Sequence, residues 1–397
     1  MKIVAMPSAP VKDSSLKQLS YQELDILHCL RGFCAFYVVV YHAKYIMWSG
    51  GREYLTAFPR ATWDLTQYVL FAVDMLSSAG YEMVIFFFVL SGFFIRYAQK
   101  RKPRAAGAFY LNRIVRIYPP YIASALLAAG CLTLVAQYIP QMLTVDGHHE
   151  LNISLLAAWA DLQHFHLSTL LRTLAFLPGD SSVFIGYNSV YWSLLPEALF
   201  YLVVPLAFWR VRAYYIASVL LYLIGVITAT LHYQWGAAVD FLLLYNFYFA
   251  VGVALYDVVV HSPWLMWFKR VSGSLLLVVV LLLAAALLPL AVLKLKVLSG
   301  FVAVLLAVVS VSGLLAGRVS RRNVAVRLFH PMGVFSFSLY LYHFPLLILC
   351  GSVLVVTTGE LVNYARYYWL AIPVVTLISY AIYWVTERVS VNFFRKV

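Results

Sequence analysis

Charged side chains are scarce in this sequence of 397 residues, and carboxylates are the scarcest of them. Only 11% of the residues are charged, 63% are hydrophobic, and the mean hydropathy is +0.84. So little charge excludes an ordinary soluble globular protein and indicates a polytopic membrane protein. The 29 basic residues outnumber the 16 acidic ones. The excess gathers in the connections between apolar segments, so we expect no nucleic-acid partner.

Cysteine is rare as well, and it shows no pairing or metal-ligand pattern. The chain has four cysteines, all in apolar segments: Cys29, Cys34, Cys131 and Cys350. We interpret them as small buried side chains rather than as disulfides. Four histidines gather in one polar stretch: His148, His149, His164 and His166. Their spacing matches no strong ligand pattern, so we interpret the stretch as a solvated loop and expect no metal.

Apolar runs of about 20 residues predict the fold, because that length crosses a bilayer as a helix. We place about ten spanning helices at roughly 26–47, 81–99, 119–139, 190–209, 213–231, 240–257, 272–292, 297–316, 332–356 and 367–387. The expected fold is an all-α integral membrane domain over 26–390. It lies between an N-terminal segment, 1–25, and a short tail, 391–397. The one long connection is about 140–189.

Basic residues mark alternate connections. One set of connections and the C-terminal tail are rich in them: Arg96, Lys100, Arg101, Lys102, Arg104, Arg113, Arg116, Arg210, Arg212, Lys269, Arg270, Arg318, Arg321, Arg322, Arg327, Arg388, Arg395 and Lys396. Cytoplasmic connections carry such an excess. We therefore expect both termini in the cytoplasm and the 140–189 connection on the extracytoplasmic side.

The first apolar segment, ILHCLRGFCAFYVVVYHAKYIM, contains two ionisable residues, Arg31 and His42. Such groups inside a span usually serve a bundle interior or a polar cavity. Eleven residues are about three helical turns, so both side chains share a face, roughly 16 Å apart along the axis. A shielded histidine can accept a proton from a hydroxyl. A structural hydrogen bond between helices is the alternative interpretation.

The strip FYLNRIVRIYPPY carries Arg113 and Arg116, which are three residues apart and so share a helical face. Paired arginines at a membrane surface suit phosphate groups. The alternative is a topological signal that also contacts anionic lipid headgroups. Pro119 and Pro120 suit the first turn of the third helix, where their missing N–H groups matter little.

The segment VYWSLLPEALFYLVVP begins the fourth span and places Glu197 roughly 10 Å below the surface. Pro196 is expected to bend the helix there. Trp192, Ser193 and Tyr201 are nearby, so the segment predicts a polar site. An ion pair between Glu197 and another helix, for instance with Arg31 or Lys44, is the alternative.

Two further segments combine polar and small residues. In FSFSLYLYHFPLL, His343 lies near the predicted midplane and shares a face with Tyr340; it is either a site residue or a structural contact. In FFFVLSGFFIRY, Ser91 and Gly92 permit either close helix packing or access for a narrow ligand. Arg96 follows at the membrane edge.

Together these motifs resemble the integral-membrane acyltransferase family three, the ten-helix O-acyltransferases of bacterial surface and secreted glycans. The resemblance runs from LRGFCAFYVVVYHA through FFFVLSGFFIRY, FYLNRIVRIYPPY and VYWSLLPEALFYLVVP to SFSLYLYHFPLL. The motifs occur in family order and cover about residues 22–390. This order is far more specific than any single motif.

The resemblance implies an acyl-CoA donor, most simply acetyl-CoA, and a glycan or lipid-linked sugar acceptor at a bacterial inner membrane, among membrane lipids. It implies His42 as general base or transient acyl carrier. Arg31 is expected to lie along the path of the pantetheine arm or to orient the thioester, and Glu197 is expected to orient His42 or to fix the acceptor. Donor binding is expected from Arg113, Arg116, Arg96 and Ser91. Acceptor binding is expected from Trp192, Ser193, Tyr201 and His343.

A second function class remains open from the residues alone. Arg31, His42, Glu197 and His343 could instead line the path of a transporter or flippase for a glycan or small polar solute. The absence of repeated halves argues against that interpretation, although helix number and charge do not exclude it. Donor-dependent modification of a glycan would separate the two.

Overall fold

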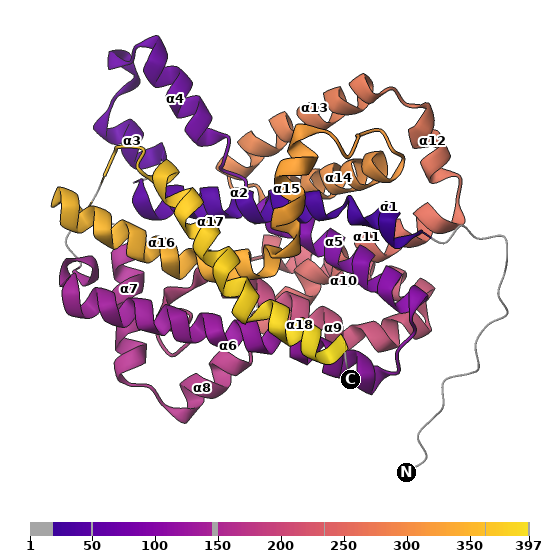
Figure 1. Ribbon diagram of the computed structural model, residues 1–397, viewed down its shortest axis with the longest axis horizontal. Coiled ribbons are helices and arrows are strands. Elements are labelled where there is room, and N and C mark those ends of the chain that lie inside the picture. The colour runs from indigo at the N-terminus through magenta and orange to yellow at the C-terminus, as the bar shows by residue number, and fades with distance from the viewer. Residues whose placement is uncertain (1–18, 49–50, 145–149, 234, 362, 396–397) are drawn as a thin grey trace.

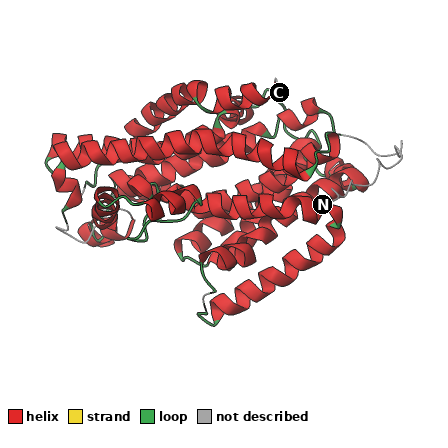
Figure 2. Ribbon diagram, turned by 90° about the horizontal axis from the view of Figure 1, so that it is seen from below, coloured by secondary structure: helices red, strands yellow, loops and turns green. Residues whose placement is uncertain are grey.

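The computed structural model describes residues 19–48, 51–144, 150–233, 235–361 and 363–395. Helices make up 82% of the structure, and no strand occurs among these residues (Figure 2). Within the same ranges, ten stretches are long and apolar enough to cross a membrane. The predicted all-α integral membrane fold is therefore confirmed, including the number of spans.

Each of the ten stretches contains one long helix. These helices are α2 (His28–Met47), α5 (Gly80–Arg101), α6 (Ala106–Tyr138), α9 (Leu194–Trp209), α10 (Val211–Thr230), α11 (Ala237–His261), α13 (Gly273–Val292), α14 (Lys296–Leu315), α16 (Ser336–Thr358) and α17 (Tyr368–Val385). Shorter helices flank them: α1 (Tyr21–Asp25), α3 (Gly51–Ala57), α4 (Leu65–Met75), α7 (Glu150–Gln163), α8 (Leu167–Leu174), α12 (Trp264–Arg270), α15 (Val324–Val334) and α18 (Glu387–Arg395). The described residues also contain four short 3₁₀ helices: η1 (Arg60–Thr62), η2 (Pro140–Leu143), η3 (Ile185–Tyr187) and η4 (Ser189–Ser193).

The bundle is built around α2 and α16 (Figure 1). Helix α2 packs against α5, α15, α16 and α17, and α16 also packs against α6. At one edge α13 packs on α14, while α7 and α8 lie at the opposite edge. The outward side chains are apolar; Leu206 and Leu281, for example, are 67% and 57% exposed. A surface of this kind is suited to lipid, since in water it would drive aggregation.

Helix α6 begins thirteen residues earlier than predicted, at Ala106 instead of 119, so Pro119 and Pro120 lie inside it and not in its first turn. A proline in a helix leaves the carbonyl four residues before it without its N–H partner. Here the hydroxyl of Ser390 in α18 donates to the carbonyl of Val115, which Pro119 leaves free. The helix therefore continues, and Arg116 and Arg113 lie about one and two turns before the prolines.

The predicted bend at Pro196 is also wrong. Pro196 is the third residue of α9, in the first turn, where no helical N–H bond is lost. The residues before it, including Ser193, form η4. Because α9 begins directly after η4, Ser193 contacts Tyr340 of α16 and Glu197 contacts Ser91 of α5.

Helices α5 and α11 touch through two glycines. A Cβ added to Gly92 would lie 2.0 Å from the carbonyl oxygen of Phe249, and one added to Gly252 would lie 1.9 Å from that of Val89. Small residues let backbones approach in this way. Of the two roles expected for Gly92, close packing is therefore the one the geometry supports.

We predict that Gly92→Ala and Gly252→Ala each destabilise the folded protein in detergent. The added methyl group must push two helix backbones apart, and overpacking of this kind typically costs about 1–3 kcal/mol. Thermal unfolding monitored by size-exclusion chromatography measures the effect. Gly130→Ala in α6 is the control, because no atom lies within 4 Å of its added Cβ. Equal stability of all three variants would contradict the close contact.

Candidate active site

A cavity of about 280 Å³ lies among the N-terminal half of α2, α5, α6, α9 and the start of α16. Its polar and aromatic walls are Tyr21, Asp25, His28, Arg31, Phe87, Phe88, Ser91, Phe94, Tyr97, Arg113, Arg116, Ser193, Glu197, Tyr201, Ser336, Phe337 and Tyr340. The cavity thus extends from the first residues of α2 to the middle of the bundle. Seven predicted site residues share it: Arg31, Ser91, Arg113, Arg116, Ser193, Glu197 and Tyr201.

Three arginines give the cavity its positive charge. Arg31 donates from Nε to the hydroxyl of Ser336 at 3.3 Å. The guanidinium of Arg113 lies 5.5 Å from the centre of the Tyr201 ring. Neither of them, nor Arg116, forms an ion pair with a carboxylate among the described residues. The Nε atom of Arg113 is buried with no hydrogen-bond partner. The three side chains are partly buried, and Arg113 donates to the side chain of its neighbour Asn112. Cations shielded from water normally have a counter-charge, so these arginines point to an anionic ligand.

Glu197 is held by two hydroxyl groups in the cavity wall. The hydroxyl of Ser91 donates to its Oε1 at 3.3 Å, and that of Tyr201 donates to the same atom. No hydrogen bond joins Glu197 to His42, and none of the ion pairs expected with Arg31 or Lys44 forms. The structure therefore places Glu197 with the cavity and separates it from His42.

His42 pairs with another histidine, His343 of α16. Nδ1 of His42 lies 2.9 Å from Nε2 of His343, and Nδ1 of His343 lies 2.9 Å from the carbonyl oxygen of Leu339. The centres of the two rings are 5.1 Å apart, and the ring planes are inclined by 25°. His343 is fully buried, whereas His42 is partly exposed. Sequence reasoning named both residues, but not as partners.

The histidine pair adjoins the deep end of the cavity without lining it. Tyr340 forms part of the cavity wall, and its ring lies 6.1 Å from that of His343. The Tyr340 hydroxyl lies 2.7 Å from that of Ser193. One aromatic side chain therefore connects the wall that carries the arginines to the histidines.

Two predicted site residues lie elsewhere. Arg96 donates to the two carboxylate oxygens of Asp257, from Nε at 2.9 Å and from Nη2 at 2.8 Å, and its side chain is 7% exposed. Trp192 stacks on Tyr81 with ring centres 5.8 Å apart and also touches Tyr245. Neither Arg96 nor Trp192 lines the cavity. The carboxylate that neutralises Arg96 is far away in sequence, which is why the motif alone suggested a phosphate site.

Sequence reasoning missed the residues at the cavity entrance. His28 and Asp25 line it, and Asp25 also binds His330 at 3.1 Å and Arg321 at 3.2 Å. The spacing of His28, three residues before Arg31, was the available signal, since i and i+3 share a helix face. Of the four histidines in the long connection, His164 and His166 are exposed, and His148 and His149 lie outside the described residues.

Comparison with known proteins decides the class. The family model of the acyltransferase-3 proteins, described as "Acyltransferase domain", matches residues 24–384. The chain belongs to the acyltransferase-3 family. With its ten apolar helices, it is an integral membrane acyltransferase. No curated protein and no solved structure matches the chain significantly.

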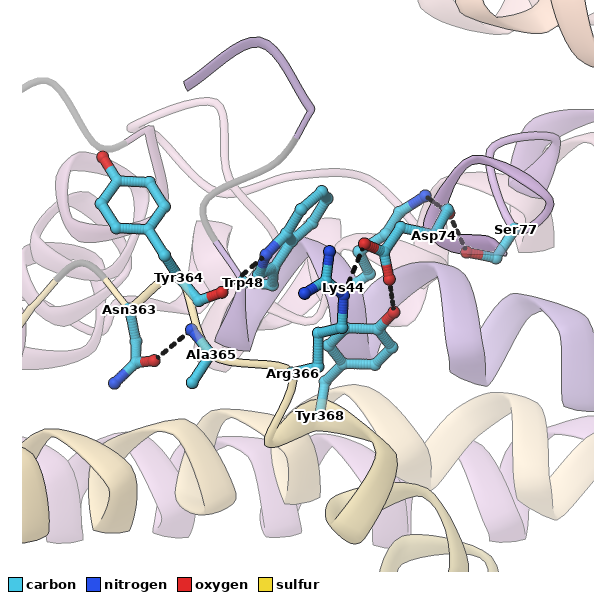
Figure 3. Close-up of polar contacts among 9 residues, drawn as sticks. All are labelled: Lys44, Trp48, Asp74, Ser77, Asn363, Tyr364, Ala365, Arg366 and Tyr368. Carbon is cyan, nitrogen blue, oxygen red and sulfur yellow. Dashed lines mark hydrogen bonds and ion pairs between the residues drawn. The ribbon is translucent and has the colours of Figure 1, made fainter. Parts of the chain in front are cut away.

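In this acyltransferase the helix that carries His42 is held at its C-terminal end by a buried polar clasp around Asp74 (Figure 3). Lys44 donates to the Asp74 carbonyl at 2.7 Å, Arg366 pairs with the Asp74 carboxylate at 2.8 Å, and the Tyr368 hydroxyl donates to it. Trp48 adds a hydrogen bond to the carbonyl of Tyr364 at 3.2 Å. The clasp joins α2 to α4 and to the connection between α16 and α17.

We predict that Asp74→Asn destabilises the acyltransferase by about 3 kcal/mol, because it breaks an ion pair whose carboxylate is fully buried and leaves the half-buried Arg366 cation without its counter-charge. Thermal unfolding in detergent measures the loss. Adding Arg366→Met restores part of it, since the unpaired cation is then gone. Glu360→Gln is the control, as Glu360 is exposed in the same connection. Wild-type stability of Asp74→Asn would show that the clasp does not hold this end.

Proposed function

We propose that this membrane acyltransferase moves an acyl group, acetyl in the simplest case, from cytoplasmic acyl-CoA to a hydroxyl of a lipid-linked or polymeric glycan on the extracytoplasmic side of a bacterial inner membrane. The observation that carries the proposal is the cavity with three arginines that lack carboxylate partners, ending beside a histidine pair. A path of this shape suits a long donor with phosphates at one end and a reactive thioester at the other.

Arg113 and Arg116 support the proposed binding of the acyl-CoA phosphates. Guanidinium groups bind phosphate oxygens through forked, charge-assisted hydrogen bonds. The unpartnered Nε of Arg113 is a donor available for such a bond. The rings of Phe87 and Phe94 give apolar walls for a pantetheine arm, and Arg31 lies 5.8 Å from the centre of the Phe94 ring and donates to Ser336. Arg96 and Trp192 have no part in this path.

The proposed direction of acyl transfer follows from the side of the bundle on which the cavity opens. Tyr97 and Ala98, near the end of α5, line its entrance. The last turn of α5 carries Lys100 and Arg101, and the connection that follows contains Lys102 and Arg104. Basic connections lie on the cytoplasmic side. His42 lies in the other half of α2, toward the clasp, so an acceptor would approach from the opposite side. Donor and acceptor would then meet in the bundle.

The proposed reaction is direct transfer. The acceptor oxygen bonds to the acyl carbon, the carbon–sulfur bond breaks, and the acceptor proton passes through the imidazole of His42 to the leaving thiolate. General-base catalysis of this kind contributes about 10²- to 10⁴-fold. Glu197, bound to Ser91 and Tyr201, would order the cavity wall against which the donor lies instead of orienting His42.

We predict that His42→Ala abolishes acyl transfer and leaves the fold intact, since the partly exposed imidazole supplies the base. Vesicles that contain the protein and membrane glycan receive radiolabelled acetyl-CoA, and label in glycan and released CoA are counted. Unchanged melting and donor KM in the variant serve as the control. Full activity of His42→Ala would remove this residue from the chemistry; no turnover by wild type with any acyl-CoA would refute the proposed function.

We also predict that Arg113→Ala and Arg116→Ala each raise the KM for acetyl-CoA about tenfold or more, because each removes charge-assisted hydrogen bonds worth about 1.5–3 kcal/mol. Initial rates against donor concentration give the KM. Lys102→Ala is the matched control, an exposed cation at the same end of the bundle. If all three variants share the wild-type KM, the arginines only mark topology.

A further inference from the structure

The hydrogen bonds around His343 fix the position of its proton. Its Nδ1 atom lies 2.9 Å from the carbonyl oxygen of Leu339. A carbonyl oxygen only accepts, so the hydrogen of this bond must be on Nδ1. In the neutral ring the other nitrogen, Nε2, then carries a lone pair and no hydrogen. His343 is fully buried, which favours the neutral ring.

The hydrogen-bond partner of His42 fixes the position of its proton in the same way. Its Nδ1 atom lies 2.9 Å from Nε2 of His343, which can only accept. His42 must therefore donate from Nδ1, and its own Nε2 is left with the free lone pair. No described residue makes a hydrogen bond to that Nε2, and the His42 ring is partly exposed. These hydrogen bonds, from His42 through His343 to the Leu339 carbonyl, form a relay. The relay leaves Nε2 of His42 as the basic nitrogen that faces away from the pair.

We propose that His343 is a positioning residue that fixes the tautomer of His42, so that Nε2 of His42 is the nitrogen that takes the acceptor proton. This inference rests on the proposed function and assigns His343 a role distinct from the acceptor binding that the resemblance implied. When the acceptor hydroxyl gives its proton to Nε2, His42 becomes an imidazolium ring. Its Nδ1–H bond to His343 strengthens, and the proton on Nε2 then passes to the leaving thiolate. His343 neither gains nor loses a proton.

The surroundings hold His343 in place. Pro345 lacks the N–H that would bond the carbonyl of Leu341, and that carbonyl instead accepts from the hydroxyl of Ser124 at 2.8 Å and from the amide of Asn188 at 2.9 Å. Helix α16 is thereby tied to α6 and to the connection before η4, close to the histidine. A relay needs such rigidity, since a tautomer is set only while the distance holds.

No carboxylate among the described residues hydrogen-bonds to either histidine. In hydrolases with a Ser-His-Asp triad the orienting partner of the histidine is an aspartate, and replacing that aspartate by asparagine lowers kcat about 10⁴-fold because the wrong tautomer forms. Here a neutral imidazole and a carbonyl oxygen would perform the same orientation.

The test compares His343→Leu with His343→Gln. Leucine accepts no hydrogen bond, so His42 is no longer held in one tautomer; kcat should fall about 10²-fold or more while the KM for acetyl-CoA changes little. Glutamine retains an acceptor oxygen, and its kcat should recover to within about tenfold of wild type. A wild-type kcat in folded His343→Leu overturns the inference and leaves the proposed function standing. The inference is also overturned if both variants lose activity only in proportion to a loss of folded protein.

A second measurement does not depend on activity or on the leucine variant folding. NMR of isotope-labelled histidine ring nitrogens, with His42→Ala for assignment, reports which nitrogen of His42 carries hydrogen. The inference expects a protonated Nδ1 and a bare Nε2 in wild type. The opposite tautomer overturns it, whatever the rates are. Absence of acyl transfer by wild type, with the expected tautomer present, would instead refute the proposed function.

Discussion

The structure depends on one constraint: inside a bilayer, each polar group must find its partner within the protein. The bundle meets it in several ways. Asp257 neutralises Arg96, and Arg366 neutralises Asp74. Carbonyls released by prolines are taken up by side chains, as Ser390 does for Val115. The three arginines of the cavity differ from these groups, because none has a carboxylate partner among the described residues. Cations left without a counter-charge in an apolar bundle indicate where an anionic ligand binds.

Hydropathy and motif position predicted much of this molecule. Ten apolar runs gave ten spans, because length and composition alone decide whether a helix crosses a bilayer. Arg31, Arg113 and Glu197 come from three separate motifs and line one cavity. For Arg31 and Glu197 this was predictable, since a charged side chain in an apolar span must turn inward and the inward faces of neighbouring helices meet. Arg113 was assigned to a connection at the membrane surface, and it lines the cavity because α6 already begins at Ala106.

Pairings between distant segments were not predictable. His42 and His343 are separated by 301 positions, and Arg96 and Asp257 by 161. Which inward groups touch depends on the rotation of each helix about its axis and on its depth in the membrane. Hydropathy does not determine the rotation, and it fixes the depth only to within about one helical turn. The errors at Pro119 and Pro196 have a local cause instead. A proline permits both a helix start and a helix interior, and the choice follows from whether another segment satisfies the released carbonyl.

The neutral character of the histidine pair fits the medium in which it lies. A carboxylate beside His42 would orient it strongly, but a buried charge must be desolvated and then compensated, and few cations are free to do so. A chain of imidazole, imidazole and carbonyl has no net charge at rest. Charge would develop on His42 only while a proton is in transit, and only where the ring is partly exposed. An orienting partner that is uncharged therefore lets a base operate deep in a bundle without a permanent ion pair, whereas the permanent charges stay where phosphate groups are proposed to meet them.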